Sequence, residues 1–322
     1  MTHDILLVVL GLVALTAGAE GLVRGGSRLA LGLGLSPLFI GLTIVSYGTS
    51  APEMVVSVLA AIRERPDIAV GNVVGSNIFN IAVVLGLSAV IAPLPCRARL
   101  LRRELPIVIA VTVVLLLFSL GGSLNRIESM LFLVALGAYS GWSYRTARQE
   151  NRTAEEPVGI PTVDTPSRLA SLGFAIGGTV LLVLGARWLV DGAADLARLV
   201  GISDAVIGLT VVATGTSLPE LATSIAAALK RELDIAIGNI LGSNIFNVLG
   251  ILGITAAVHP VGIAPHLTLF DIPVALGFAL VSVPMMMTGR RISRAEGLVL
   301  FLTYVAYIIL LFQKNGPLNL PG

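Results

Sequence analysis

The chain has 322 residues, of which 55% are hydrophobic and only 12% are charged, and its mean hydropathy is +0.93. This composition excludes an ordinary soluble domain and indicates that lipid surrounds most of the chain. The net charge of +2 predicts no nucleic-acid partner, and the single cysteine, Cys96, excludes an internal disulfide and a cysteine-rich metal site.

Apolar runs of about 20 residues recur from one end of the sequence to the other, and each can cross a hydrocarbon layer about 30 Å thick. The first run lacks the basic flank and cleavage site of a secretory signal, so it is expected to stay as a helix. We expect ten membrane helices, over residues 4–30, 37–62, 68–93, 104–121, 127–145, 168–199, 204–229, 235–258, 267–288 and 295–313.

The sequence repeats itself at an offset of 167 residues. Residues 41–53 (GLTIVSYGTSAPE) match residues 208–220 (GLTVVATGTSLPE) at 9 of 13 positions, and residues 71–80 match residues 238–247 at 8 of 10. Glu104 corresponds to Asp271 at the same offset, and a one-residue shift then aligns Tyr139 with Tyr307. The repeat therefore extends over most of each half.

Each half holds five expected helices, and five is an odd number of membrane crossings. The second half must therefore enter the membrane from the other face. The predicted fold is an all-α polytopic membrane protein with ten transmembrane helices arranged as two inverted five-helix repeats. The predicted division is a first repeat over residues 1–146, a polar cytoplasmic linker loop over 147–167 and a second repeat over 168–322.

The distribution of basic residues predicts the orientation. With an outside N-terminus, 15 of the 21 lysine and arginine residues fall on the cytoplasmic side, as the positive-inside rule favours. We expect a multi-pass protein of the cell (plasma or inner) membrane with both termini extracytoplasmic.

Two acidic residues stand in the middle of apolar runs, Glu53 and Glu220, each at the end of a Gly-Thr-Ser-x-Pro-Glu motif. A lone carboxylate at that depth costs a few kcal/mol or more unless it has a partner. One such residue could be a hydrogen-bonded structural group, but two copies in equivalent positions indicate a functional site.

Proline residues precede both glutamates, and Pro52 and Pro219 each lack the N–H that a helix needs. We expect each helix to break near Gly48 or Gly215 and to free carbonyl groups there. Further oxygen donors surround the breaks, namely the hydroxyls of Thr49, Ser50, Thr216 and Ser217 and the amides of Asn80 and Asn247. Carboxylate, carbonyl, hydroxyl and amide oxygens without thiolate or imidazole favour a hard cation such as Ca²⁺.

Other interpretations of the flanking residues stay open. Asn80 and Asn247 could instead join helices by hydrogen bonds. Ser76 and Ser243 could simply be small residues at a helix contact.

The paired Gly-Thr-Ser-x-Pro-Glu and Gly-Ser-Asn-Ile-Phe-Asn segments resemble the calcium/cation antiporter superfamily, and in particular its sodium/calcium exchanger family of the prokaryotic type. The resemblance covers essentially the whole chain. It implies an antiporter that exchanges Na⁺ for Ca²⁺ by alternating access, with no cofactor. It also implies a core of four motif-bearing helices, the second, third, seventh and eighth, across which the first and sixth helices slide. Glu20 with Arg24 and Arg187 with Asp191, on those two helices, have the spacing of intrahelical ion pairs.

The resemblance also implies the ligands. Ca²⁺ would be bound by Glu53, Glu220 and the backbone carbonyls of Thr49 and Thr216. One Na⁺ site would use Ala213, Thr216, Ser217, Glu220 and Ser76, and its counterpart would use Ser46, Thr49, Ser50, Glu53 and Ser243.

The chain departs from the family pattern at one point. Many of these exchangers carry an aspartate at one of the two positions occupied here by Asn80 and Asn247. Without that acid, Glu53 and Glu220 together carry a charge of −2, which one Ca²⁺ or two Na⁺ would neutralise. The coupling ratio is left open, and we expect transport to be independent of potassium.

Two other functions remain possible, a proton/Ca²⁺ (or other divalent cation) antiporter of the same superfamily and a passive cation channel. An enzyme is disfavoured, because the three histidines lie at the terminus or in a loop and no catalytic group of residues is evident. The expected partners are Ca²⁺, Na⁺ and membrane lipid, with no obligate protein partner.

Overall fold

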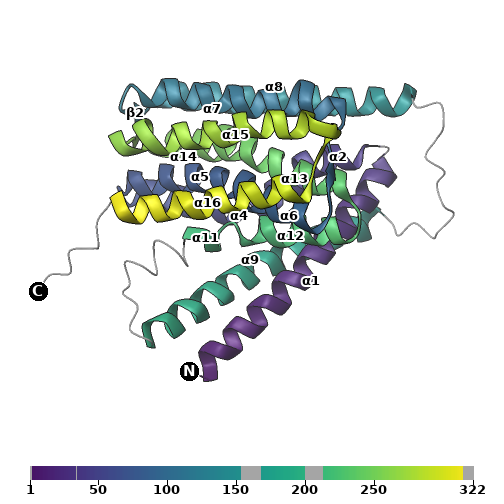
Figure 1. Cartoon of the computed structure of the whole chain (residues 1–322), viewed down its shortest axis with the longest axis horizontal. Helices are drawn as coiled ribbons and strands as arrows, with labels where there is room; N and C mark the ends of the chain where they lie inside the picture. The colour runs from purple at the N-terminus through teal and green to yellow at the C-terminus, as the bar shows by residue number, and fades with distance from the viewer. Residues whose placement is uncertain (1, 34, 154–167, 200–212, 315–322) are drawn as a thin grey trace, which may run out of the picture.

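The structure is a computed structural model that describes residues 2–33, 35–153, 168–199 and 213–314. Each of the ten expected ranges contains helix in its described part (Figure 1). The first half comprises α1 (Thr2–Leu33), α2 (Pro37–Ile40), η1 (Gly41–Val45), α3 (Ser46–Thr49), α4 (Ala51–Ile62), α5 (Pro66–Phe79), η2 (Asn80–Leu85), α6 (Gly86–Ile91), β1 (Leu94–Pro95), η3 (Leu100–Glu104), α7 (Leu105–Ser119), β2 (Ser123–Leu124) and α8 (Arg126–Thr153). The second half comprises α9 (Arg168–Leu199), α11 (Ala213–Gly215), α12 (Leu218–Leu229), α13 (Leu233–Phe246), η5 (Asn247–Leu252), α14 (Gly253–Val258), β3 (Val261–Gly262), η6 (Leu267–Asp271), α15 (Ile272–Met287), η7 (Thr288–Arg290), β4 (Arg291–Ile292) and α16 (Arg294–Lys314).

Several helices have the length and composition of membrane spans. Within the described residues, five are long and apolar enough to cross a bilayer, and a bent pair formed by α2–α3 and α4 raises the number to six. The five lie at Thr2–Leu29, Pro66–Ile91, Leu169–Ala193, Leu233–Val258 and Leu267–Arg290. Among the other expected ranges, α7 and α12 are helical but shorter, with 15 and 12 residues.

The centre of the molecule is formed by α5–α6 and α13–α14. In the apolar stretches of these two spans 78% and 89% of the residues are buried, against 33% in α1 and in α9. Both central spans change to wider π-helical turns at equivalent points, η2 starting at Asn80 and η5 starting at Asn247. Such turns are rare and occur frequently at functional sites.

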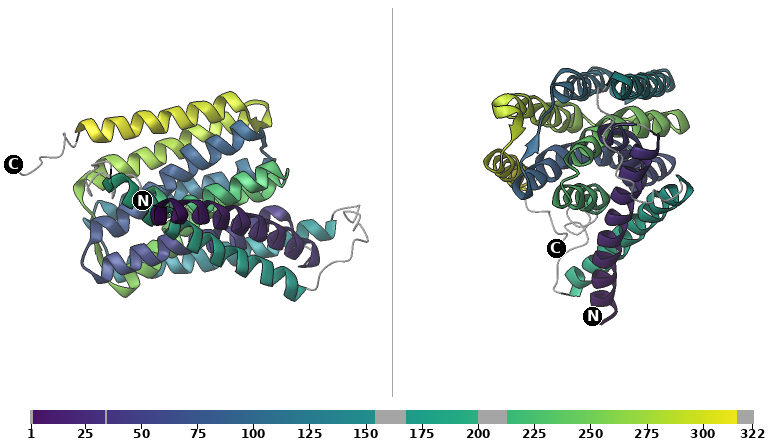
Figure 2. Two further views of the ribbon diagram at one scale, coloured as in Figure 1. Left: turned by 90° about the horizontal axis from the view of Figure 1, so that it is seen from below. Right: turned by 90° about the vertical axis from the view of Figure 1, so that its right-hand side faces the viewer.

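Glycine lets α1 and α9 approach backbone to backbone. Gly11, Gly18 and Gly25 recur every seven residues in α1, and Gly178, Gly185 and Gly192 stand at the corresponding positions 167 residues later. A Cβ at Gly18 would lie 2.7 Å from Leu182 N, and one at Gly185 would lie 2.7 Å from Leu15 N. The two helices therefore run antiparallel and cross the rest of the bundle obliquely as a tight pair (Figures 1 and 2).

Short strands join the two halves of the chain. β1 pairs antiparallel with β4, and β2 pairs antiparallel with β3, with two residue pairs in each ladder. β1 and β3 correspond at the 167-residue offset, so the two ladders are equivalent connections made in opposite directions between the halves.

The ion pairs expected within α1 and α9 are present. Arg24 contacts Glu20, and Arg187 Nε lies 3.8 Å from Asp191 Oδ2. Glu20 also accepts from Lys230 Nζ at 3.1 Å. This contact ties α1 to the end of α12, a link that sequence spacing within one helix cannot indicate.

The segment expected to be a linker loop is helical at its start. α8 continues to Thr153, seven residues past the expected boundary at 146, and residues 154–167 lie outside the described part.

Candidate functional site

The helix containing Glu53 is broken at Ser50. That residue leaves the helical region with φ −80° and ψ 10°, and the axes of Pro37–Thr49 and Ala51–Ile62 differ by 47°. The second copy turns in the same way at Ser217, with φ −88° and ψ 6°. Both breaks come two residues later than expected, because each proline occupies the first turn of the following helix, where its missing N–H is not needed.

The two glutamates are fully buried and are bound by the opposite half of the chain. Ser50 Oγ donates to Glu220 Oε1 at 2.7 Å, and Ser217 Oγ donates to Glu53 Oε1 at 3.0 Å. The second oxygen of each carboxylate, Oε2, has no hydrogen-bond partner among the described residues. A buried carboxylate oxygen without a donor is costly, so both positions favour a cation.

Asn80 and Asn247 are also fully buried, each at the first residue of its π-helical turn. Asn247 Nδ2 donates to Asn77 Oδ1 at 3.0 Å, whereas its Oδ1 and both amide atoms of Asn80 lack partners in the described part of the chain. Interhelical hydrogen bonding therefore accounts only for the amide nitrogen of Asn247. The remaining oxygens are available to a ligand.

The serine and threonine residues of the predicted site are brought together as well. Ser217 Oγ lies 3.0 Å from Ser76 Oγ, so Ser76 borders the Glu53 carboxylate through that hydroxyl. Ser46 Oγ donates to Thr43 O at 3.1 Å, and Ser243 Oγ is buried with no partner among the described residues. Ala213 begins α11, three residues before Thr216, and its side chain lies outside the described part of the chain.

Sequence reasoning missed a second pair of asparagines, Asn72 and Asn239. Their amides donate to the backbone carbonyls of Glu53 and Glu220, at 3.1 Å and 3.3 Å. The signal was available, because both stand in the Gly-Asn pair that opens the repeated segments 71–80 and 238–247. Nothing in the residue type alone distinguished them from interhelical contacts.

The aromatic rings beside the site were not anticipated either. Tyr47 follows Ser46 and stacks on Phe246, which precedes Asn247, with 4.3 Å between ring centroids. Tyr47 Oη also lies 2.9 Å from Ser140 Oγ on α8. These contacts fix the broken helix against α13 and α8 close to the candidate ligands.

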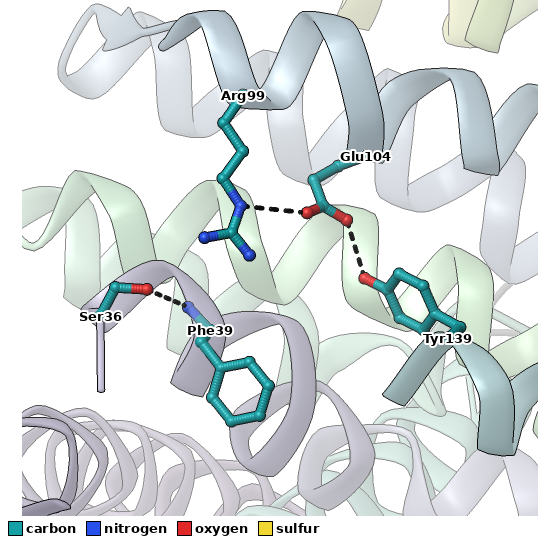
Figure 3. Close-up of polar contacts among 5 residues, drawn as sticks. All are labelled: Ser36, Phe39, Arg99, Glu104 and Tyr139. Atoms are coloured by element: carbon teal, nitrogen blue, oxygen red, sulfur yellow. Dashed lines mark hydrogen bonds and ion pairs between the residues drawn. The ribbon is translucent and has the colours of Figure 1, made fainter. Parts of the chain in front are cut away.

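A third buried carboxylate, Glu104, lies outside this site and has its own partners (Figure 3). Arg99 Nε approaches Glu104 Oε1 at 3.4 Å, and Tyr139 Oη donates to Oε2 at 2.9 Å. The equivalent pair in the second half is Tyr307 Oη with Asp271 Oδ1 at 2.8 Å. Since both Glu104 oxygens are bound by side chains, this pair of contacts is structural in character.

Chemically, the site around Glu53 and Glu220 is an oxygen-lined centre whose two carboxylates are fully buried. Its donors are carboxylate, hydroxyl and amide groups from both halves, and several of their oxygens lack partners within the described residues. Such a set suits hard cations.

Comparison with known proteins gives a consistent result. The family model described as sodium/calcium exchanger protein matches residues 3–145 and 170–313. CaxA of Alkalimonas amylolytica is 40% identical over 316 residues, covering 95% of this chain and 98% of that protein. The sodium/calcium exchanger MaX1 of Methanosarcina acetivorans is 33% identical over 348 residues, covering 97% and 99%.

Among solved structures, the sodium-calcium exchanger NCX_Mj soaked with zero Na⁺ and Ca²⁺ superposes with a TM-score of 0.84 at 29% identity, over 97% of this chain and 99% of that one. The all-helical fold is thus that of the exchanger, and the protein is a multi-pass membrane transporter rather than an enzyme. The chain belongs to the sodium/calcium exchanger protein family.

Proposed function

We propose that this protein exchanges Na⁺ for Ca²⁺ across the membrane by alternating access at one shared site. The observation that carries the proposal is the pair of buried carboxylates, Glu53 and Glu220, each bound by a serine of the other half and each with one oxygen unpartnered in the described chain. The ions themselves are supported by the printed names of MaX1 and NCX_Mj, both sodium/calcium exchangers.

The proposed ligands follow the residues that line this centre. Ca²⁺ is bound by Glu53, Glu220 and the backbone carbonyls of Thr49 and Thr216. Each Na⁺ site shares one of the two carboxylates. Its remaining ligands are Ala213, Thr216, Ser217 and Ser76 for the Glu220 site, and Ser46, Thr49, Ser50 and Ser243 for the Glu53 site, with Asn80 and Asn247 completing the shell.

Charge balance explains why such a site exchanges ions. Two ionised glutamates carry −2, which one Ca²⁺ or two Na⁺ would cancel, while Asn80 and Asn247 add no charge. An empty site would carry its charge through an apolar environment, which costs several kcal/mol. Movement between the two access states is therefore restricted to occupied, neutralised forms.

The proposed architecture is ten membrane crossings in two inverted repeats, residues 1–146 and 168–322, joined by a cytoplasmic segment. In this arrangement both termini lie outside the cytoplasm and the protein resides in the cell membrane. The antiparallel pairing of α1 with α9, through equivalent glycines, supports the inverted relation. The tight α1–α9 pair is the element proposed to slide over the remaining helices.

The test is uptake of radiolabelled Ca²⁺ into proteoliposomes driven by an outward Na⁺ gradient. Glu53→Gln and Glu220→Gln should each lower uptake by at least about tenfold, because each removes a charged ligand. Glu104→Gln is the matched control, a buried carboxylate outside the site, and should retain uptake per folded molecule.

Undiminished uptake in either site variant would refute the assignment. Replacing the Na⁺ gradient with a pH gradient distinguishes the proton/Ca²⁺ antiporter, which would continue to work without sodium. Ca²⁺ flux that ignores the counter-ion would instead indicate a passive channel.

A further inference from the structure

Asn72 and Asn239 each contact both halves of the chain at once. Asn72, on α5, donates from Nδ2 to Glu53 O at 3.1 Å and to Ser57 Oγ at 3.0 Å, both on α4 of its own half. Its Oδ1 accepts from Thr216 Oγ1, in the other half, at 3.3 Å. One amide group therefore fixes the glutamate-bearing helix of the first half to the threonine beside the second break.

Asn239, on α13, makes the same contacts in the opposite direction. Its Nδ2 donates to Glu220 O at 3.3 Å and to Ser224 Oγ at 2.9 Å, and its Oδ1 accepts from Thr49 Oγ1 at 3.1 Å. Thr49 Oγ1 also lies 3.2 Å from Ser46 O, so its single proton is shared. Asn239 is fully buried, whereas Asn72 is half-buried.

We propose that Asn72 and Asn239 are positioning residues that couple the two halves of the cation site. The inference rests on the proposed function, since it concerns the same site. Each asparagine donates to the backbone carbonyl of the glutamate in its own half and accepts from the hydroxyl of the threonine in the other half, so it fixes the positions of both residues. A shift of one broken helix on ion binding is thereby passed to the other half.

The amide is suited to this role because it both donates and accepts. An aspartate would accept from threonine but could not donate to the glutamate carbonyl, and it would add a buried charge. The hydroxyl oxygens of Ser57 and Ser224 accept from the second proton of each amide, so both protons of each amide are hydrogen-bonded within its own half. These polar groups thus determine which way the oxygen and the nitrogen of each amide face.

A double-mutant cycle on Ca²⁺ binding tests the coupling in the full-length purified protein. Asn239→Ala should weaken Ca²⁺ binding by about tenfold, since it leaves buried polar groups unpaired. Thr49→Val removes only the hydroxyl and keeps the carbonyl proposed as a ligand. The double variant Asn239→Ala with Thr49→Val should lose less than the product of the two single losses, because both changes break the contact between Asn239 and Thr49.

The matched comparison is Asn239→Ala with Thr216→Val, because Thr216 donates to Asn72 and not to Asn239. Here the losses should multiply. Multiplicative losses in both pairs would overturn the inference, because a merely structural asparagine would show no preference for the threonine of the opposite half.

A second comparison does not depend on the folding of the asparagine variants. Thr49→Ser keeps the hydroxyl that donates to Asn239, so it should bind Ca²⁺ several-fold more tightly than Thr49→Val, which lacks that hydroxyl. Equal affinities for the two would also overturn the inference. An unaltered protein that binds no Ca²⁺ would overturn the proposed function as well, whereas normal binding with uncoupled pairs would overturn this inference alone.

Discussion

Replacing Gly185 by alanine should force α1 and α9 apart. The added Cβ would lie 2.7 Å from Leu15 N, 2.9 Å from Gly11 O and 3.0 Å from Ala14 Cβ. Normal contacts of this kind need about 3.5 Å or more, so the helices must separate locally by roughly 0.5 to 1 Å. Two of the three contacts are with backbone, which cannot rotate away, and overpacking of this kind costs about 1 to 3 kcal/mol.

Gly177 provides the matched control on the same helix. A Cβ at Gly177 meets no atom within 4 Å among the described residues. Alanine there should gain the helix-propensity difference of about 0.5 to 1 kcal/mol. The two glycine-to-alanine changes should therefore move stability in opposite directions.

The assay is thermal unfolding of each purified variant in the same detergent, followed by Na⁺-driven Ca²⁺ uptake in proteoliposomes. Gly185→Ala should lower both the melting temperature and the uptake rate, and Gly177→Ala should lower neither. Equal melting temperatures for the two variants would refute the backbone contact between α1 and α9. A stable Gly185→Ala variant with unchanged uptake would separate that contact from transport.

Three further outcomes are expected. Tyr139→Phe should destabilise the protein by about 1 to 3 kcal/mol in chemical or thermal unfolding, because it removes the hydroxyl that donates to the fully buried Glu104. Tyr307→Phe should cost less, because its partner, Asp271, is only half-buried. Burial raises the pKa of the Cys96 thiol to about 11, so maleimide should label Cys96 slowly near pH 7 and faster as the pH rises. The control is Ala98→Cys in a Cys96→Ala background, which places the thiol at an exposed position and should be labelled fast. Rapid labelling of Cys96 in the folded protein would contradict this prediction. Na⁺-driven Ca²⁺ uptake should be the same with and without K⁺, because the expected acidic ligand is replaced by Asn80 and Asn247; a K⁺ requirement would show that another group supplies the missing charge.

Much of the fold follows from local pattern in the sequence. Apolar run length predicts where helices form, and the 167-residue repeat relates one half to the other without any structural information. Glu53 and Glu220 stand out because lipid makes an isolated carboxylate costly, and the preceding prolines predict a break. The break is displaced by two residues because proline is accommodated in a first turn as readily as it ends a helix.

The remaining features depend on tertiary contacts. The bond from Ser50 to Glu220 joins residues 170 positions apart, and a repeat alignment shows only that they belong to equivalent motifs. The π-helical turns that begin at Asn80 and Asn247 were likewise not predicted, because an apolar run indicates a helix but not where its backbone hydrogen-bond pattern changes. The seven-residue glycine spacing was visible in the sequence, but only the antiparallel pairing explains it.

The two small ladders have a consequence for the order of assembly. β1 is complete once residue 95 has been synthesised, yet its partner β4 begins at Arg291, and β2 similarly waits for β3 at Val261. The first half must therefore enter the membrane with both of its connecting segments unpaired. The segment of β2 can pair only after residues 261–262 have been made, and that of β1 only after residues 291–292, so the fold is completed late and by both halves together.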